Sequence, residues 1–306
     1  MRHPTSEPAP VDLPPCAGRS LSSRGRCHEV TEGGASPRAT QETQRATDAD
    51  PARRLRPAIL VIAGTDSSGG AGLAADIRTA ACHDVNARLA VTAVTAQTDG
   101  RVRRIDVMPP ALVADQVALA LEDGHVSAVK IGMLGNAAVV GAVADALSGY
   151  SGPIVLDPVI AASSGGLLLS EGGIATLFAR LLPITRLVTP NLPELDILAA
   201  RLGVPAGADT DAKARALIEA GAGAVLVKGG HGDGQDAVDI LYRRDRPPLR
   251  LASPRIAATL RGTGCTLATA TACRLALGDT AEDACRGAKA FVRRLLRERA
   301  DLTKSG

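Results

Sequence analysis

From Ala58 onward, short apolar runs alternate with Ala- and Leu-rich stretches of ten or more residues that have helical apolar spacing. Nearly continuous apolar runs are typical of strands buried on both faces of a sheet. Strands that alternate with helices form parallel sheets with crossover helices. The predicted parallel strands are residues 58–63, 89–95, 128–131, 153–156, 186–189 and 224–227, and the clearest predicted helices are 71–84 and 136–147.

The last part of the chain has a different pattern. Residues 237–242 and 249–252 predict an antiparallel pair, joined by a polar turn that contains Pro247 and Pro248. Two helices follow, of which the first covers 267–277 and stops at Gly278. The expected fold is therefore α/β, with a mostly parallel central sheet and helices on both faces.

Residues 1–56 differ in composition from the rest of the 306-residue chain. They hold seven of the 19 prolines, but Val11, Leu13, Leu21, Val30 and Leu55 are their only branched aliphatic residues. Such a segment buries too little apolar surface to offset the entropy of ordering. We predict a disordered N-terminal extension over 1–56 and one α/β domain over 57–306.

Composition argues against several classes of partner. The 35 Lys and Arg nearly balance the 32 Asp and Glu, and with no Trp, two Tyr and two Phe the chain offers few stacking platforms, so nucleic acid is not expected. No apolar run suits a signal peptide or a membrane span. The six cysteines form no CxxC pair, so a structural metal is not expected. We expect a cytoplasmic protein, and a homodimer is possible.

Glycine clusters and polar residues gather where the predicted strands end. They occupy residues 64–72, 96–98, 132–134, 157–159, 190–194 and 228–231. In doubly wound sheets, ligands bind outside the carboxyl ends of the strands. One rim of the sheet is therefore the predicted site.

The segment from Gly262 to Thr266 opens a predicted helix, so free backbone N–H groups and the positive helix end converge there. We expect an anion at this point. The chain has no GxxxxGK[ST] phosphate loop and no complete GxGxxG fingerprint, which disfavours P-loop NTPases and dinucleotide-binding dehydrogenases. Asp157 and Glu194 suit Mg²⁺ contacts, and Lys228 suits phosphate, as phosphoryl transfer requires.

Six motifs occur in a fixed order along the chain. They are Gly64-Thr-Asp-Ser-Ser-Gly-Gly-Ala-Gly72, Lys130-Ile-Gly-Met-Leu134, Asp157-Pro-Val159, Thr189-Pro-Asn-Leu-Pro-Glu194, Lys228-Gly-Gly-His231 and Gly262-Thr-Gly-Cys-Thr266. Together they resemble the hydroxymethylpyrimidine/phosphomethylpyrimidine kinases, which are the thiamine-biosynthesis branch of the ribokinase-like superfamily. The resemblance covers residues 58 to about 297.

The resemblance implies the activity and the role of each position. It implies ATP-dependent phosphorylation of 4-amino-5-hydroxymethyl-2-methylpyrimidine, and then of its monophosphate to the diphosphate, with Mg²⁺ as cofactor. The implied pyrimidine site is Gly64, Asp76, Gln97, Met133, Val159 and Lys289. The implied positions for ATP and Mg²⁺ are Asn191, Lys228, Thr263 and Glu194, to which the strand-end argument adds Asp157. The implied catalytic turn is Gly262, Thr263, Gly264 and Cys265.

Two of these roles have a physical rationale. Asp76 and Gln97 suit an aminopyrimidine, because a carboxylate and an amide can pair with its ring nitrogens and its exocyclic amine. Cys265 stands where most ribokinase-like sugar kinases carry an aspartate base. At a helix start beside Arg261 and Lys289, its pKa is expected to fall below about 8.5, which would make it a base for the substrate hydroxyl.

Five positions depart from the family pattern: Ala74, Thr98, Ser163, Gly166 and Arg261. Arg261 adds a guanidinium beside the anion site. These departures put the rate and the substrate range in doubt more than the reaction class. The alternatives are a pyridoxal or pyridoxine kinase of the same superfamily, and a catalytically silent protein that binds thiamine precursors. A cysteine hydrolase that pairs Cys265 with His231 or His83 is a weaker alternative, because no motif orients such a pair.

Overall fold

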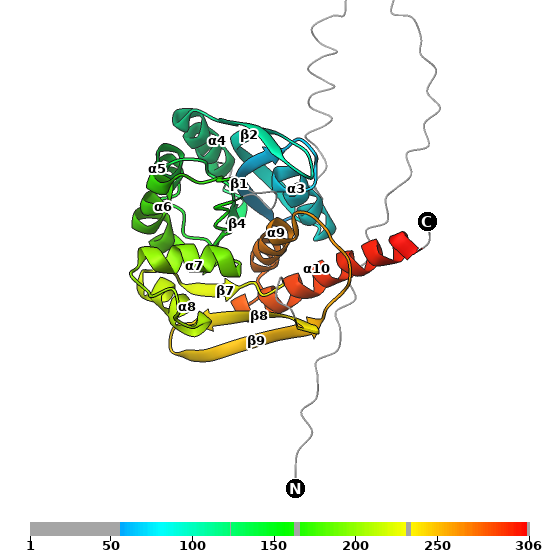
Figure 1. Cartoon of the computed structure of the whole chain (residues 1–306). Coiled ribbons are helices and arrows are strands. Elements are labelled where there is room, and N and C mark those ends of the chain that lie inside the picture. Colours follow the sequence, from blue (N-terminus) through cyan, green and yellow to red (C-terminus); the bar gives the residue numbers. More distant parts are fainter. Residues whose placement is uncertain (1–55, 123, 162–165, 231–233, 305–306) are drawn as a thin grey trace, which may run out of the picture. The chain divides into compact units, whose positions relative to one another are not determined.

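The computed structural model describes residues 56–122, 124–161, 166–230 and 234–304. Ser163, His231 and nearly all of the predicted extension 1–56 lie outside these residues. The described chain forms a nine-stranded sheet with the order β3-β2-β1-β4-β5-β6-β7-β8-β9 (Figure 1). The strands are β1 (Ala58–Asp66), β2 (Asn86–Gln97), β3 (Val102–Val107), β4 (Val126–Ile131), β5 (Ile154–Leu156), β6 (Leu187–Val188), β7 (Ala224–Val227), β8 (Asp236–Arg243) and β9 (Arg246–Pro254).

Helices cover the sheet on both sides, which confirms the predicted α/β fold. They are α3 (Gly72–Cys82), α4 (Pro110–Glu122), α5 (Ala137–Ala146), α6 (Glu171–Thr176), α7 (Leu192–Arg201), α8 (Thr210–Glu219), α9 (Thr263–Ala276) and α10 (Ala281–Lys304). A π-helical turn (Leu177–Leu181) and a 3-10 turn (Leu182–Ile184) follow α6.

The interior strand β1 contributes side chains to both hydrophobic cores. Ile59 and Val61 pack in the core beneath α3, α9 and α10. Leu60 and Ile62 pack in the opposite core, with residues of α4, α5, α7 and α8. Because successive side chains of a strand point to opposite faces, only a continuously apolar strand can fill two cores. This explains the unbroken apolar run with which the domain begins.

The strand order reverses at β1, which pairs in parallel with β2 on one side and β4 on the other. The chain thus fills the sheet outward in both directions from β1. Such a switch point leaves a crevice at the carboxyl ends of the strands, where α/β proteins bind ligands. The fold therefore predicts a ligand site at the loops after β1, β2 and β4.

The two edges of the sheet differ from the prediction. β3 was not predicted and pairs antiparallel with β2. Pro247 and Pro248 lie within β9 and not in the turn, because the hairpin closes between Arg243 and Arg246, with Asp245 at a φ of 56°. β9 is an edge strand whose pairing with β8 shifts register opposite these two prolines, and edge positions and bulges are where residues without an N–H donor cost a sheet the fewest hydrogen bonds.

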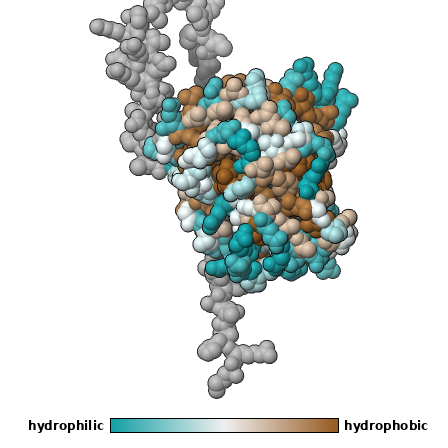
Figure 2. All heavy atoms as spheres, turned by 90° about the vertical axis from the view of Figure 1, so that its left-hand side faces the viewer, coloured by the Kyte–Doolittle hydropathy of each residue, from teal (hydrophilic) through white to brown (hydrophobic). Residues whose placement is uncertain are grey.

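The outer surface of the helices is mixed in polarity. Figure 2 looks onto the side that lies to the left in Figure 1, where α5, α6 and α7 lie, and shows apolar and hydrophilic residues interspersed. This is the pattern of helices that turn one apolar face toward a sheet. In the described ranges, every helix is too short or too polar to cross a membrane.

Candidate active site

A pocket opens at the carboxyl ends of β1, β2 and β4, beside the start of α9. Five predicted site residues line it: Gly64, Gln97, Met133, Val159 and Cys265. The other lining residues are Ala63, Thr65, Asp66, Ala71, Gly72, Thr95, Lys130 and Leu168. The pocket therefore lies on the rim that the strand-end residues indicated.

Glycines shape the walls of this pocket because side chains would collide there. A Cβ atom on Gly64 would lie 3.0 Å from the Met133 sulfur. Gly72 and Gly262 have φ angles of 55° and 72°, and a Cβ on either would overlap the backbone oxygen of Gly64 or Gly70, respectively. The loop between β1 and α3 therefore packs directly against the turn that begins α9.

The start of α9 is an uncapped helix end. No side chain of the described residues caps it, and the Thr266 N–H donates to the Gly262 carbonyl at 2.8 Å. A Cβ on Gly264 would lie 3.3 Å from Lys228 Nζ and 3.8 Å from Asp157 Oδ2. A positive helix end and a lysine thus meet at one point, as suits a phosphate, and the carboxylate beside them would need a cation between itself and that phosphate.

Lys228, Asp157 and Glu194 form a buried charge cluster beside this turn. Lys228 Nζ lies 2.7 Å from Asp157 Oδ1 and 3.8 Å from Glu194 Oε2. Burial raises the pKa of Glu194 to about 7; Lys228 opposes this rise and Asp157 adds to it. Burial alone would lower the pKa of Lys228, but the two carboxylates outweigh it and raise the pKa. The lysine is therefore charged across the neutral range.

Asn191 and Glu194 also begin α7. Asn191 Oδ1 accepts from the Glu194 N–H at 2.8 Å, and Glu194 Oε2 accepts from the Asn191 N–H at 2.8 Å, which is a reciprocal capping box. The structure thus brings both residues to the side of Lys228, and the local sequence Asn-Leu-Pro-Glu explains why the helix starts there.

The Cys265 thiol is half-buried and lines the pocket. The expectation that its pKa is lowered is wrong, because burial raises the pKa to about 11 although Lys130 opposes the rise. The two cations expected to favour the thiolate have carboxylate partners elsewhere: Arg261 contacts Asp66, and Lys289 contacts Asp239. Cys265 is therefore a neutral thiol near pH 7.

Asp76 is not one of the residues that line the pocket. It has no exposed surface; its Oδ2 accepts from Lys130 Nζ at 2.9 Å, and its Oδ1 accepts from Thr269 Oγ1 at 2.6 Å. Burial raises the pKa of Asp76 against the opposing effect of Lys130. The group that reaches the pocket from this pair is Lys130, so direct contact of Asp76 with a pyrimidine stays a prediction.

Lys289 likewise lies outside the described pocket lining. Its Nζ is 2.8 Å from Asp239 Oδ2, and Asp239 Oδ1 accepts from the Gly229 N–H at 3.0 Å. The lysine of α10 is thus linked through a strand β8 carboxylate to the loop that follows Lys228. Its predicted reach to the pyrimidine also stays a prediction.

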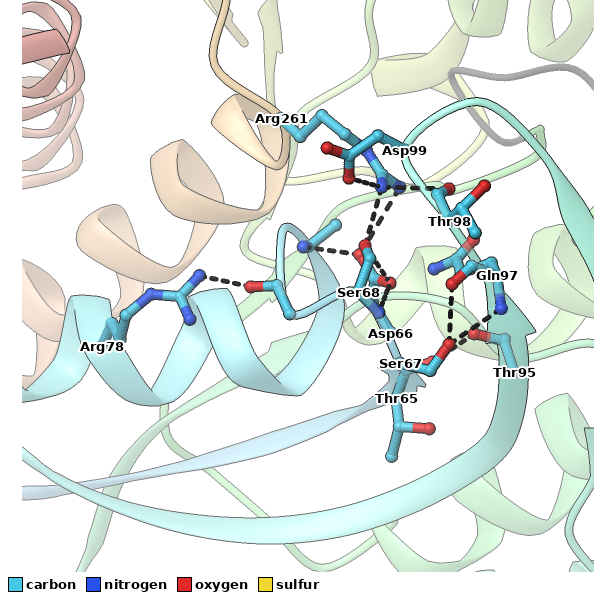
Figure 3. A network of polar contacts seen from close by, with 12 residues as sticks. Thr65, Asp66, Ser67, Ser68, Arg78, Thr95, Gln97, Thr98, Asp99 and Arg261 are labelled. Carbon is cyan, nitrogen blue, oxygen red and sulfur yellow. Dashed lines mark hydrogen bonds and ion pairs between the residues drawn. The ribbon is translucent and has the colours of Figure 1, made fainter.

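Asp66 and Gln97 form a polar wall of the pocket (Figure 3). Asp66 Oδ1 accepts from the backbone N–H and the hydroxyl of Ser68, and Oδ2 accepts from the Ala71 N–H at 2.8 Å. Burial would raise the pKa of Asp66, but hydrogen bonds from Ser68, Gln97 and Ala71 hold the pKa below its ordinary value. Asp66 is therefore an ionised carboxylate that is held mainly by donors from its own loop, Ser68 and Ala71.

Sequence reasoning assigned no site role to Asp66 or Lys130, although both lie in quoted motifs. One signal pointed to Lys130: a lysine inside an otherwise apolar strand, two residues before Gly132. The structure gives the reason for that glycine, since a Cβ there would lie 2.9 Å from Lys130 Nζ. Thr65, Thr95 and Leu168 carried no such signal.

Four of the five departing positions, all except Ser163, lie in the described part of the chain. Ala74 lies half-buried in α3, and Gly166 has a φ of 96°. The backbone oxygen of Thr98 accepts a hydrogen bond from Arg261 at 3.3 Å. Of these substitutions, Arg261 is the one that makes contacts of its own around the pocket.

The sequence over residues 66–306 matches a family model described as phosphomethylpyrimidine kinase. The chain belongs to this family. It is 39% identical over 234 residues to a hydroxymethylpyrimidine/phosphomethylpyrimidine kinase of Rhizobium meliloti, a match that covers 76% of this chain and 88% of the relative. The family is that of the predicted resemblance, so the chain is a member of a phosphotransferase family.

Solved structures of two kinds share the fold. A phosphomethylpyrimidine kinase from Clostridium difficile has a TM-score of 0.67 and 31% identity, and covers 79% of this chain and 100% of its own. A pyridoxal kinase from Staphylococcus aureus, in complex with AMP-PCP and pyridoxal, has a TM-score of 0.69 and 30% identity, covering 78% and 87%. Backbone similarity alone therefore does not separate the two activities.

Proposed function

We propose that this protein transfers the γ-phosphoryl group of ATP to the hydroxymethyl oxygen of 4-amino-5-hydroxymethyl-2-methylpyrimidine, and then phosphorylates the resulting monophosphate. One observation carries this proposal. The small-molecule pocket and the phosphate site share the turn Gly262–Cys265: Cys265 lines the pocket, while Gly264 stands beside Lys228 and Asp157. An acceptor hydroxyl and a terminal phosphate can therefore meet across that turn.

The chain's own groups suit the transfer step. The acceptor oxygen forms a bond to the γ-phosphorus as the bond to the bridging oxygen of ADP breaks, and the hydroxyl proton is released. Negative charge on the phosphoryl oxygens then faces the N–H groups at the start of α9 and the Lys228 ammonium. Lys228 stays charged because Asp157 and Glu194 flank it.

The donor set beside Lys228 fits Mg²⁺. Asp157 and Glu194 are two oxygen donors within reach of one ammonium group, and the raised pKa of Glu194 indicates that this site would gain from another cation. Mg²⁺ is commonly held by one or two carboxylates and substrate phosphates, so a set smaller than three carboxylates suffices. When bound, the ion would neutralise charge on the transferred phosphate.

Because the Cys265 thiol is neutral, it is not a preformed thiolate base for the substrate hydroxyl. In a loose phosphoryl-transfer transition state, positioning contributes more than removal of the acceptor proton. We infer that Cys265 positions the hydroxymethyl group at the end of α9, where the thiol lines the pocket. The aminopyrimidine itself would be bound by Gln97 and by the backbone around Gly64 and Val159.

The test is ADP release by the purified protein with Mg·ATP and, side by side, the hydroxymethylpyrimidine, its monophosphate and pyridoxal. We expect kcat/KM for the hydroxymethylpyrimidine to exceed that for pyridoxal by about 5- to 150-fold, which is the usual effect of an unpaired buried polar group. Lys228→Met should abolish turnover. Lys213→Met is the matched control. Lys213 also pairs with an aspartate, since its Nζ lies 2.8 Å from Asp196 Oδ1, but it is not one of the residues that line the pocket.

The pyridoxal kinase alternative is the less supported one, because the curated relative with 39% identity is a pyrimidine kinase. Equal or faster turnover of pyridoxal would nevertheless overturn our assignment. Binding without ADP release would favour a silent precursor-binding protein. A cytoplasmic location, where ATP would be at hand, and a homodimer stay predictions.

A further inference from the structure

The backbone beside Lys228 is held from both sides of the loop that follows β7. The Lys228 N–H donates to the Pro190 carbonyl at 2.8 Å, next to the start of α7. The N–H of the following residue, Gly229, donates to Asp239 Oδ1 at 3.0 Å on β8. The position from which the Lys228 side chain extends toward the phosphate site therefore depends on a main-chain carbonyl and on one side chain, that of Asp239.

Asp239 is an acidic residue at an apolar position of β8. Its side chain points to the same face of the sheet as Leu241, two residues further on, and Leu241 lies in the core beneath α9 and α10. Gly229 explains how the loop reaches this carboxylate. A Cβ on Gly229 would overlap the Val238 carbonyl oxygen, so only glycine lets the loop pass this close to β8.

Lys289 supplies the charge that this carboxylate needs. The Asp239 side chain is 8% exposed, and a carboxylate so buried is costly without hydrogen bonds and a nearby cation. Lys289 Nζ of α10 lies 2.8 Å from Oδ2, while the Gly229 N–H contacts Oδ1. The two oxygens are thus divided between the helix and the loop, and Lys289 holds the carboxylate in the orientation that Gly229 requires.

Helix α10 therefore contacts both parts of the phosphate site. It packs along α9, whose start is the predicted anion site, through a shared core that includes Phe291 (Figure 1). It reaches the loop of Lys228 through Lys289 and Asp239. The relative position of the two parts matters because the Lys228 ammonium group stands close to the start of α9: a Cβ on Gly264 would lie 3.3 Å from Lys228 Nζ.

We propose that Lys289 is a positioning residue for the nucleotide, which acts through Asp239 to place the Lys228 ammonium group beside the start of α9. A displacement of that ammonium group weakens binding of the terminal phosphates and slows transfer, since both depend on preorganised charge. This role differs from the pyrimidine contact that the family resemblance implies for Lys289. The effect on turnover rests on the proposed kinase function, whereas nucleotide binding and the Gly229 hydrogen bond can be measured without an acceptor.

The first experiment measures the calorimetric Kd for Mg·AMP-PCP together with the KM values for ATP and for the hydroxymethylpyrimidine. We expect Lys289→Met to raise the Kd and the KM for ATP about tenfold, which is the usual effect of losing a hydrogen bond to a charged group. The KM for the pyrimidine should stay within about twofold, because the change lies on the nucleotide side. Lys289→Arg keeps the charge and should restore most of the nucleotide affinity.

A double-mutant cycle tests the path through Asp239. Asp239→Leu removes the acceptor of the Gly229 N–H and should raise the Kd for Mg·AMP-PCP about as much as Lys289→Met. Adding Lys289→Met to Asp239→Leu should have no further effect, because both changes break the same contact. Apolar replacement of both members of a buried ion pair usually preserves the fold, so the double variant carries the test even if Lys289→Met alone does not fold. Additive effects of the two changes would overturn the proposal.

Arg243→Met is the matched control. Arg243 Nη1 lies 2.8 Å from Glu282 Oε2, so it forms a second ion pair between β8 and α10. Arg243 is paired with Ala224 at the start of β7, whereas Lys228 follows the end of that strand. This variant should leave the Kd for Mg·AMP-PCP unchanged. The proposal fails if Arg243→Met and Lys289→Met weaken nucleotide binding alike, or if Lys289→Met raises the KM for the pyrimidine and not that for ATP, as a direct pyrimidine contact would.

The second experiment observes the Gly229 amide in the ligand-free protein. Lys228–Gly229 is the one Lys–Gly pair in the sequence, so labelling with carbonyl-¹³C lysine and ¹⁵N glycine gives this amide a single correlated signal. Its exchange with water should be slow in the parent and in Arg243→Met, and about tenfold faster in Lys289→Met. Equal exchange in the parent and Lys289→Met overturns the inference even if the kinase activity is as proposed. A parent that shows the expected exchange and binds Mg·AMP-PCP, but phosphorylates neither the pyrimidine nor its monophosphate, sustains the positioning role and refutes the proposed substrate.

Discussion

Glu194 offers a direct test of the electrostatics at the phosphate site. Its side chain is 10% exposed, and burial together with the nearby Asp157 raises its pKa from 4.5 to about 7. The native protein therefore binds a proton between pH 4.5 and 7 that the unfolded chain releases. Stability must fall as pH rises through this window, because the unfolded state then holds fewer protons than the native state.

The size of the effect follows from the pKa values. At about 1.36 kcal/mol per pH unit, the gap between 4.5 and about 7 corresponds to about 3 kcal/mol. Glutamine at this position resembles protonated glutamate and does not titrate. The free energy of unfolding of Glu194→Gln minus that of the parent should therefore rise by about 2–3 kcal/mol between pH 5 and pH 8.

The assay is urea denaturation of both ligand-free proteins at half-unit pH steps. Because the comparison uses the change with pH, the constant cost of altering the hydrogen bond to Asn191 cancels. The same substitution at Glu219, exposed at the end of α8, is the control and should give a constant difference. Parallel stability curves for the parent and Glu194→Gln would refute the reasoning. The same variant should lose turnover about 10²-fold, since the proposed metal contact is weakened.

Three further outcomes are expected. Asp76→Asn should lower the free energy of unfolding by about 3–5 kcal/mol in urea titrations, because the buried Lys130 ammonium loses its carboxylate; unchanged stability would contradict this. Cys265 should be alkylated ~10²-fold more slowly than a free thiol at pH 7.5, with a rate that rises with pH, as mass spectrometry can follow. Gly264→Ala places a methyl group beside Lys228 and should lower kcat by about 10²-fold in the ADP-release assay; near-normal turnover would argue against this phosphate site.

The parallel strands of the sheet were predictable because their sequence pattern is distinctive. A strand buried on both faces must be apolar throughout, as β1 is, and the helices between such strands have a different period. The sequence pattern of the edge strands is less distinctive. β3 (Val102–Val107) contains three charged residues, and β9 contains three prolines, so each forms a strand because it pairs with one neighbour and not because of its own composition.

The site was predictable to the extent that its residues sit in short motifs. Gly64, Gln97, Met133 and Val159 come from four different strand ends, and the parallel topology brings them together. Side-chain partners across the fold were not predictable in this way. Asp76 is paired with a residue 54 positions away, and the cations expected near Cys265 are held by carboxylates that no spacing rule connects to them.

Two lysine–aspartate pairs flank the start of α9, and their difference in burial separates structure from function. Lys130 and Asp76 are both fully buried, so their pairing is fixed by the fold. The Lys228 and Asp157 side chains are 13% and 3% exposed, and the Lys228 ammonium group pairs with both Asp157 and Glu194. A phosphate that binds here would compete with these two carboxylates for the Lys228 ammonium group. As Lys228 moves toward the phosphate, less of the negative charge of Asp157 and Glu194 is compensated. Phosphate binding at α9 and cation binding at these carboxylates should therefore favour one another, which is how a site can require its nucleotide and its metal together.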